Sequence, residues 1–112
     1  MIRGSIWTIA GGGAYSGKPR PAVIVQDNFF DDLGSITICP LTSIIMDVEA
    51  VRPRIEPDQS NGLKSVSQVM IDKITTLPKT RLGVQIGMLG DEDMVRVNRS
   101  LAVFLGIGGS PA

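Results

Sequence analysis

The run Pro21-Ala-Val-Ile-Val-Gln26 carries the strongest structural signal in this chain of 112 residues. Consecutive β-branched residues without polar alternation are typical of a strand that is buried on both faces. After a polar break over residues 27–34, Ser35-Ile-Thr-Ile-Cys39 has the same character. Pro40 predicts the end of this second strand, because proline cannot donate a hydrogen bond to a strand ladder.

Further short strands are predicted on both sides of these two. Ile2 to Ile9 precedes them, and residues 51–55, 65–71 and 74–78 follow them. Thirteen Gly and seven Pro residues are too many for a helical bundle, since both residue types disfavour helix interiors. The chain therefore predicts five or six short strands connected by turns.

One helix is predicted near the C-terminus. Apolar residues recur there at spacings of three and four, with Arg96 and Arg99 on the opposite side. Asp91 is expected to cap the first turn and Gly106 to end the helix. The apolar stripe consists of Met94, Val97, Leu101, Phe104 and Leu105.

Short strands followed by a single amphipathic helix predict an α+β fold that is mainly β. We expect a small, strongly bent antiparallel barrel, with the helix over an open face or end. The length of the chain corresponds to one domain, residues 1–112.

Charge and hydropathy limit the environment and the partners. Eleven basic and eleven acidic residues cancel, so net charge alone predicts neither a nucleic-acid nor a membrane partner. No run approaches the roughly 20 apolar residues of a membrane span, and residues 1–10 lack the apolar core of a signal peptide. We expect a cytoplasmic protein without a membrane partner.

Composition also limits the chemistry. The chain has no histidine, which excludes imidazole as a general base and as a zinc ligand. Cys39 is the single cysteine, so we expect a buried, reduced thiol and no intrachain disulfide. Neither Asp31-Asp32 nor Asp91-Glu-Asp93 has the ligand spacing of a calcium loop, so both are interpreted as surface or helix-cap residues.

Gly12-Gly-Ala-Tyr-Ser-Gly-Lys18 approaches the pattern of a phosphate-binding P-loop. Pro19 stands where that motif needs Ser or Thr, and a strand follows where it needs a helix. Nucleotide binding is therefore not expected. Trp7 is interpreted as a core or dimer-interface residue in preference to a base-stacking one.

Arg20 is the most informative charged residue. It lies at the start of a predicted strand between two prolines, which fix the backbone that carries its side chain. Thr42 and Ser43 follow the next strand in the same way. Taken alone, these residues are also compatible with a salt-bridge partner and with ordinary turn residues.

Five motifs follow one another along the chain and precede one helix. They are Arg3-Gly-Ser-Ile-Trp7, Gly17-Lys-Pro-Arg-Pro-Ala-Val-Ile-Val-Gln26, Pro40-Leu-Thr-Ser43, Gly62-Leu-Lys64 and Arg81-Leu-Gly-Val-Gln-Ile-Gly87. Each motif alone is weak, but their order and spacing, from about Arg3 to Gly106, resemble those of the MazF/PemK-type toxins.

This resemblance implies an SH3-like barrel, a homodimer, and an endoribonuclease that cuts single-stranded mRNA at a short sequence without a metal or other cofactor. It implies an antitoxin partner that occupies the RNA groove. It assigns the catalytic roles to Arg20 and Thr42, with Ser43 beside them. A guanidinium stays protonated near neutral pH and offers paired donors to phosphate, so Arg20 suits stabilisation of the transition state. The expected products are a 2′,3′-cyclic phosphate and a 5′-hydroxyl end.

The sequence departs from the plasmid-encoded branch of that family. Its first loop has no histidine, and Met70 stands where that branch has an arginine, while Asp72 matches a later acidic residue. Tyr15 is a candidate for stacking on RNA and Lys18 for a phosphate contact. We expect the groove to draw its positive potential from Arg3, Lys18, Arg20, Lys64 and Lys73.

Two alternatives share the expected fold. A CcdB-like toxin poisons DNA gyrase without hydrolysing anything, but the tail Gly106-Ile-Gly-Gly-Ser-Pro-Ala112 lacks the tryptophan of those toxins. A catalytically inactive family member would act only by binding, and the presence of both Arg20 and Thr42 argues against it.

Overall fold

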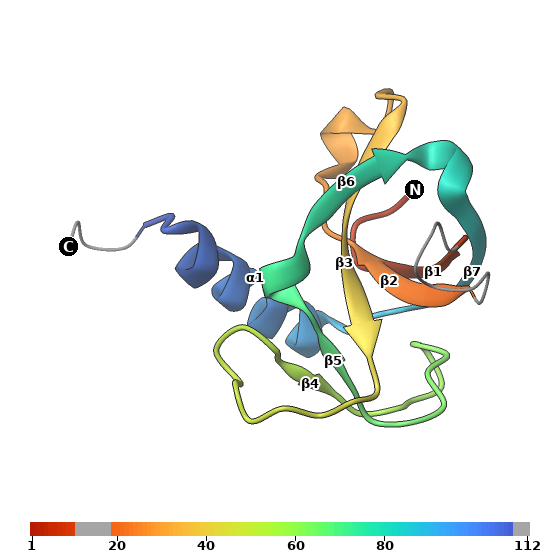
Figure 1. Cartoon of the computed structure of the whole chain (residues 1–112). Coiled ribbons are helices and arrows are strands. Elements are labelled where there is room, and N and C mark those ends of the chain that lie inside the picture. The colour runs from red at the N-terminus through yellow and green to blue at the C-terminus, as the bar shows by residue number, and fades with distance from the viewer. Residues whose placement is uncertain (11–18, 109–112) are drawn as a thin grey trace.

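The computed structural model describes residues 1–10 and 19–108, which form a curled antiparallel sheet and one long helix (Figure 1). The sheet runs in the order β4-β5-β3-β2-β1-β7, and β6 also pairs with β3. The predicted α+β, mainly β class is therefore confirmed, as a half-barrel that ends at β4 and β7. Its strands are β1 (Ser5–Ile9), β2 (Arg20–Ile24), β3 (Ser35–Thr42), β4 (Arg54–Ile55), β5 (Ser67–Val69), β6 (Thr75–Pro78) and β7 (Leu82–Met88).

The sequence predicts that β3 ends near Pro40, but the strand continues to Thr42. It pairs with β6 as far as Ile38 and with β5 from Leu41 onward. Pro40 lies between these two partners, where its missing N–H removes no ladder bond, and its carbonyl accepts the N–H of Met70 at 2.8 Å. A proline is tolerated inside a strand at such a junction.

The strand β7 was not predicted, and it closes one side of the sheet by pairing with β1. The pairing contains two register shifts, and β7 includes Gly83 and Gly87, which weaken the strand signal in the sequence. Gly87 is required by a close approach, since a Cβ there would collide with the carbonyl oxygen of Asn61.

Two apolar clusters form the core. One lies between the sheet and the helix and includes Val23, Leu41 and Val97, while the other lines the concave side of the half-barrel and includes Ile24, Ile36 and Ile38. Trp7 packs against this second cluster and donates a hydrogen bond to Ser5 Oγ at 3.0 Å, in keeping with the predicted core role. Cys39 is buried in the first cluster as a free thiol, as predicted.

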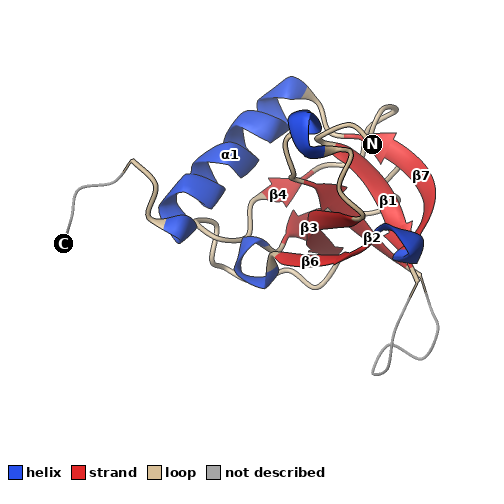
Figure 2. Cartoon of the chain, turned by 90° about the horizontal axis from the view of Figure 1, so that it is seen from above, coloured by secondary structure: helices blue, strands red, loops and turns tan. Residues whose placement is uncertain are grey.

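The helix α1 (Asp91–Leu105) lies against one face of the sheet beside β4 (Figure 2). Val97 and Leu101 are buried as predicted. The two expectations about its ends have different outcomes. Gly106 ends the helix with a φ of 72°, but the N-cap is Gly90, so Asp91 lies inside the first turn and does not cap it by its side chain.

The last two residues of the predicted stripe are not buried. Phe104 and Leu105 are 44% and 50% exposed, because the end of α1 projects beyond the sheet (Figure 1). Over the described residues, α1 included, no helix has the length and apolar character needed to cross a membrane.

Candidate active site

The position of Arg20 follows from the start of β2. Arg20 is the first residue of that strand, its side chain is exposed, and Pro19 and Pro21 restrict the backbone on both sides. The strand pairs with β1 through Ile9 and Arg20, so the backbone that carries the guanidinium is held by a ladder. The predicted stiff support for Arg20 is therefore present.

Thr42 lies across from Arg20. The strands β2 and β3 pair in the register Ala22↔Pro40, and continuing this register by two residues sets Arg20 opposite Thr42. Directly opposed residues of antiparallel strands project from the same face. Residues 22 positions apart in the sequence are thus brought to one end of a two-stranded ribbon.

The hydroxyl of Thr42 has a defined orientation. Its oxygen accepts the backbone N–H of Ile44 at 3.1 Å, so the proton of the hydroxyl remains available for donation to another oxygen. Thr42 is half-buried and Ser43 beside it is exposed. Both side chains can therefore be reached from solvent.

Arg20, Thr42 and Ser43 line one cavity of about 620 Å³, which we call the hydroxyl pocket. The predicted catalytic pair and Ser43 are thus brought together. Two serines, Ser65 and Ser67, and one lysine, Lys64, also contribute. The remaining lining residues are Thr8, Pro19, Pro21, Leu41, Ile44, Gly62, Leu63 and Ile86.

Lys64 reaches the hydroxyl pocket on a turn that is fixed by the buried side chain of Asn61. The amide oxygen of Asn61 accepts the N–H groups of Asp58 and Leu63, and its amide nitrogen donates to the carbonyl of Glu56 at 2.8 Å. Gly62 follows with a φ of 69°, and a Cβ there would collide with the carbonyl oxygen of Ile86. The motif Gly62-Leu-Lys64 therefore needs its glycine for both conformation and space.

A buried glutamine holds the segment after Thr42. Gln68 of β5 is paired with Thr42 in the register, and its side chain is fully buried. Its amide oxygen accepts the N–H of Met46 at 2.8 Å, and its nitrogen donates to the carbonyls of Met46 and Arg52 at 2.8 and 2.9 Å. The segment that carries Ser43 is thereby anchored to the sheet. The sequence offers no signal for this role, because an isolated Gln in a strand run looks like a surface residue.

Asp72 forms an ion pair with Arg52, away from the hydroxyl pocket. Its carboxylate accepts two hydrogen bonds from the guanidinium of Arg52, both at 3.1 Å, and lies outside the lining of the hydroxyl pocket. Chiefly through these hydrogen bonds, Arg52 lowers the pKa of Asp72 below its ordinary value. The predicted contact of Asp72 with substrate stays a prediction.

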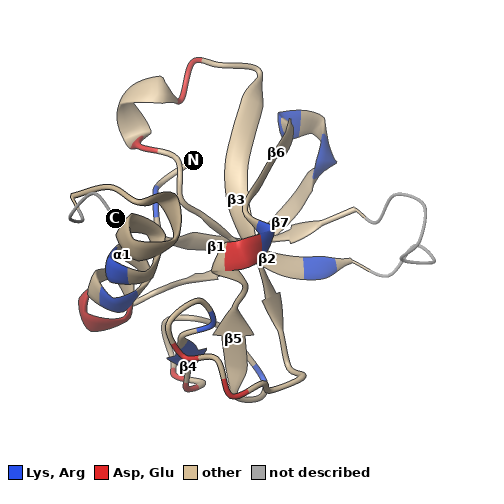
Figure 3. Cartoon of the chain, turned by 60° about the vertical axis from the view of Figure 1, so that its left-hand side comes forward, with Lys and Arg blue, Asp and Glu red and all other residues tan. Residues whose placement is uncertain are grey.

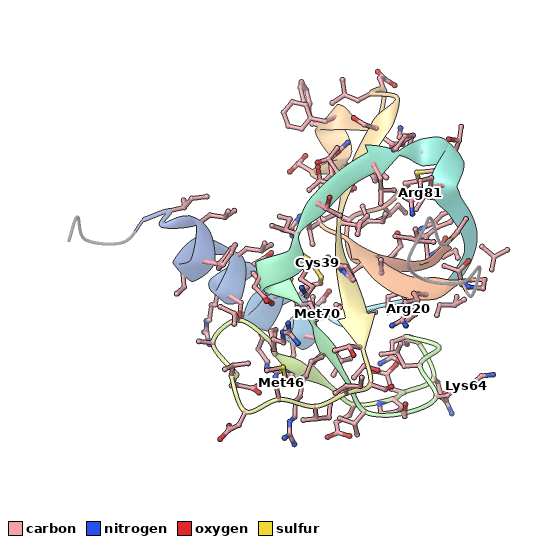
Figure 4. The ribbon with its side chains drawn as sticks, viewed as in Figure 1. Arg20, Cys39, Met46, Lys64, Met70 and Arg81 are labelled. Atoms are coloured by element: carbon pink, nitrogen blue, oxygen red, sulfur yellow. The ribbon has the colours of Figure 1, made fainter. Side chains whose placement is uncertain are left out.

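The charged residues that the structure describes in the hydroxyl pocket, Arg20 and Lys64, are both basic. Arg20 lies between Lys64 on the loop below it and Arg81 under the arc from β6 to β7 (Figure 4). Basic residues mark the start of β2 and the segment between β6 and β7, whereas residues of both signs occur on α1 and around β4 (Figure 3). Neutral net charge thus coexists with a locally positive cleft.

Other predicted residues are not gathered here. Arg3 donates its Nε to the carbonyl of Val25 at 2.8 Å and does not line the hydroxyl pocket. Tyr15 and Lys18 lie outside the described residues. In the described part of the chain, no three side chains of His, Cys, Asp or Glu form a group that could hold a metal ion.

A half-barrel that sets an arginine and a threonine across one basic cleft defines a small β-rich protein with a site suited to a phosphate ester. Residues 2–105 match the family described as "PemK-like, MazF-like toxin of type II toxin-antitoxin system". The match spans nearly the whole chain, so the chain belongs to this family, and the resemblance inferred from its motifs is confirmed.

Relatives agree with this membership. Over 109 residues, the chain is 50% identical to "Probable endoribonuclease MazF" of Mycolicibacterium smegmatis, a match that covers 97% of this chain and 100% of that protein. Two solved structures share the fold. A mycobacterial endoribonuclease in complex with its cognate antitoxin is 23% identical, with a TM-score of 0.79 over 98% of this chain and 99% of that one. The MazE-MazF structure from Deinococcus radiodurans is 20% identical, with the same TM-score over 96% and 98% of the two chains.

Proposed function

We propose that this MazF-type toxin is an endoribonuclease that cleaves single-stranded mRNA at a short sequence without a metal ion, and so inhibits translation and growth. The observation that carries the proposal is that Arg20 and Thr42, at the ends of the paired strands β2 and β3, line the same hydroxyl pocket. The name of the M. smegmatis relative supports the same activity.

Cleavage of RNA by its own 2′-hydroxyl determines what the site must do. The 2′-oxygen attacks the adjacent phosphorus, the bond from phosphorus to the 5′-oxygen breaks, and the 2′-hydroxyl proton is transferred overall to that leaving oxygen. Negative charge grows on the non-bridging oxygens in the transition state. The protein therefore needs to orient the phosphate and stabilise that charge.

Arg20 and Thr42 divide this work. The guanidinium of Arg20 donates two parallel hydrogen bonds to the non-bridging oxygens, and the rigid start of β2 fixes its direction. Thr42 donates its hydroxyl proton to an oxygen of the same phosphate, since its own oxygen is already occupied by the N–H of Ile44. Ser43 assists from the adjacent position. The products are a 2′,3′-cyclic phosphate and a 5′-hydroxyl end.

The proposed partners of the chain are single-stranded RNA, a cognate antitoxin and a second copy of itself in the cytoplasm. The relatives from mycobacteria and D. radiodurans are described in complex with antitoxin or MazE, which supports an antitoxin for this chain. The exposed apolar residues at the end of α1, among them Val103 at 69%, support a protein partner at that end.

The test is cleavage of a long single-stranded RNA by the purified full-length chain in excess chelator, followed by mapping of both new ends. We expect cuts at one short sequence with cyclic-phosphate and 5′-hydroxyl ends. Arg20→Ala and Thr42→Ala should leave no cuts detectable by this end mapping, whereas Arg99→Ala, on the exposed side of α1, should leave them unchanged.

Cleavage that disappears with chelator would contradict metal independence, and cleavage that survives Arg20→Ala would contradict the assigned site. Supercoiling of DNA by gyrase, measured with the same preparation, should be unaffected. Inhibition of gyrase without any RNA cleavage would favour the CcdB-like alternative.

A further inference from the structure

Residues 43–53, which we call the site loop, connect β3 to β4 and begin at the hydroxyl pocket. Ser43 and Ile44 line that pocket, and the N–H of Ile44 orients the hydroxyl of Thr42. The apolar side chains in the first half of the loop are exposed, so they do not anchor it by burial. They are Ile44, Ile45, Met46 and Val48. The half of the loop that adjoins the hydroxyl pocket is therefore held mainly by polar contacts.

Arg52 holds this loop at a second place, besides the backbone contacts of Gln68. Its Nη1 donates to the sulfur of Met46 at 3.2 Å, while its Nε and Nη2 donate to the two carboxylate oxygens of Asp72, both at 3.1 Å. The N–H of Arg52 donates to the carbonyl of Val48 at 2.9 Å, and its carbonyl accepts the amide of Gln68. Arg52 thus joins the two halves of the site loop to each other.

Asp72 gives Arg52 a fixed anchor outside the loop. It lies in the short helix η3 (Ile71–Lys73), whose first residue is buried and donates its N–H to the carbonyl of Val51 at 3.0 Å. The side chain of Arg52 is only 12% exposed. Paired donors from a guanidinium to a carboxylate have a defined geometry, unlike exposed single ion pairs, which contribute little. The ion pair therefore fixes the site loop relative to η3.

We propose that Arg52, held by Asp72, is a positioning residue for cleavage. It fixes the site loop, so that the N–H of Ile44 keeps the hydroxyl of Thr42 directed at the scissile phosphate. The inference rests on the proposed nuclease function and adds a determinant of its rate. Neither Arg52 nor Asp72 lines the hydroxyl pocket, so the role needs no contact with RNA. It gives Asp72 a task other than the substrate contact that the sequence predicts.

The experiment separates the cleavage rate from binding and from folding. The wild-type chain first maps a cleavage site, which tests the proposed function. A short RNA across that site is then cleaved in single turnover at saturating protein, where the rate constant belongs to the bound complex and not to the fraction of folded chain. Dissociation constants are measured by fluorescence anisotropy, with a 2′-O-methyl group on the attacking ribose. Wild type is compared with Arg52→Gln, Asp72→Asn and the double variant.

Each single variant should lower the rate constant about tenfold, because the hydroxyl of Thr42 is held less precisely. Binding of the uncleavable RNA should change by less than about twofold, since Arg20 and Lys64 remain in place. The double variant should be no slower than the slower single one, because both substitutions break the same contact. Arg52→Lys, which keeps the charge without the paired donors, should be slowed less than Arg52→Gln.

Glu49→Gln is the matched control, because it also removes a carboxylate of an ion pair that involves the site loop. Glu49 pairs with Arg96 of α1 at 2.9 Å, but its side chain is 59% exposed. Exposed pairs of this kind contribute little. The rate constant of Glu49→Gln should therefore stay within about twofold of wild type.

Hydrogen exchange gives a readout that needs no RNA. In Arg52→Gln the backbone amide of Met46, which donates to Gln68, should exchange about tenfold faster than in wild type, because the site loop opens more often. The amide of Val25, which donates to the carbonyl of Thr37 away from the loop, is the internal reference and should be unchanged.

Three results would overturn the inference and leave the nuclease function in place. The first is a rate constant within twofold of wild type for both single variants, or unchanged exchange at Met46 in Arg52→Gln. The second is weaker RNA binding by Asp72→Asn with effects that multiply in the double variant, which would show that Asp72 contacts the RNA itself. The third is equal slowing by Glu49→Gln. A wild-type chain that cleaves no RNA would instead overturn the proposed function, and the positioning role would fall with it.

Discussion

Two cavities share Arg20 and Pro21 but differ in most of their other lining residues: the hydroxyl pocket, and a smaller one of about 290 Å³, the apolar pocket, whose walls are Ile9, Ala22, Ile38, Pro40, Met70 and Leu77. Four of the residues that line the first carry hydroxyls on loops or strand ends near Thr42, whereas the second is walled by buried side chains of the half-barrel. The two sides of Arg20 thus differ in the side chains that they present, polar groups near Thr42 on one side and mainly buried apolar groups on the other.

The two pockets also differ in what holds them in place. The walls of the apolar pocket are held by packing in the core. The loops that line the hydroxyl pocket are held by hydrogen bonds from two buried amide side chains, Asn61 and Gln68. Mutations can therefore separate them, and the predictions below run from the largest expected effect to the smallest.

Arg20→Lys tests whether Arg20 acts through the paired, planar hydrogen-bond donors of its guanidinium or only through its positive charge. Lysine keeps the charge but not the paired, planar donors, so single-turnover cleavage should fall by about 10²- to 10³-fold. Binding of uncleavable RNA should change by less than about tenfold, because the charge remains. Cleavage near the wild-type rate would show that a point charge is enough and would remove the geometric argument.

Gln68→Leu should break the hydroxyl pocket and spare the apolar one. The substitution removes three hydrogen bonds and leaves the N–H of Met46 and two carbonyls without their buried partner. We expect the free energy of unfolding to fall by about 2 to 3 kcal/mol, as measured by urea denaturation. Cleavage of RNA should fall more than binding of uncleavable RNA, because the segment that carries Ser43 loses its anchor while Arg20 stays in place. Equal loss of cleavage and binding would show that the substitution disturbs more than the hydroxyl pocket.

The pair of Arg52 and Asp72 predicts a smaller effect, on acid stability. Because Arg52 lowers the pKa of Asp72 in the folded chain, the pair stabilises the fold above the ordinary carboxyl pKa of about 3.9. That contribution is lost as pH falls through the lower folded value. Asp72→Asn should cost about 1 kcal/mol at pH 7 and less below pH 4, measured by thermal unfolding across pH.

Arg52→Gln, which removes the partner of Asp72, should show the same trend. A constant difference between Asp72→Asn and the wild type from pH 7 to pH 2 would contradict the assignment of the ion pair.

The smallest effect on RNA cleavage is expected from modification of Cys39, because this residue lies in the core and lines neither cavity. Burial raises the pKa of its thiol to about 12, so almost no thiolate exists at pH 8. A thiol reagent should react very slowly with the folded chain and fast after unfolding, and RNA cleavage should be unchanged after treatment of the native protein. Rapid reaction in the native state would show that the first core cluster opens easily.

The sequence predicted the residues of the hydroxyl pocket better than their arrangement. Arg20, Thr42 and Ser43 were identified from motifs, but Pro40 was interpreted as a strand end, and the register that opposes Arg20 to Thr42 depends on β3 passing through it. Residue patterns report burial and local conformation, whereas register is decided by pairing between distant segments.

The apolar pocket was not predicted at all. Its walls are ordinary core residues that give no functional signal in the sequence, and the cavity arises only where β6 and the turn before β7 curl over β2. Phe104 and Leu105 show a different limit, because the sequence predicts their burial and the structure leaves them exposed. Their spacing is that of a buried stripe, but helical periodicity does not show where the sheet beneath the helix ends.

The central claim, that Arg20 and Thr42 act together on one phosphate, is tested most directly by a double-mutant cycle. Single-turnover rate constants would be measured for wild type, Arg20→Ala, Thr42→Ala and the double variant, with saturating protein. Residues that act as a unit are not additive, so the double variant should be about as slow as the slower single one. A double variant slowed by the product of the two single effects would show that the two side chains act independently.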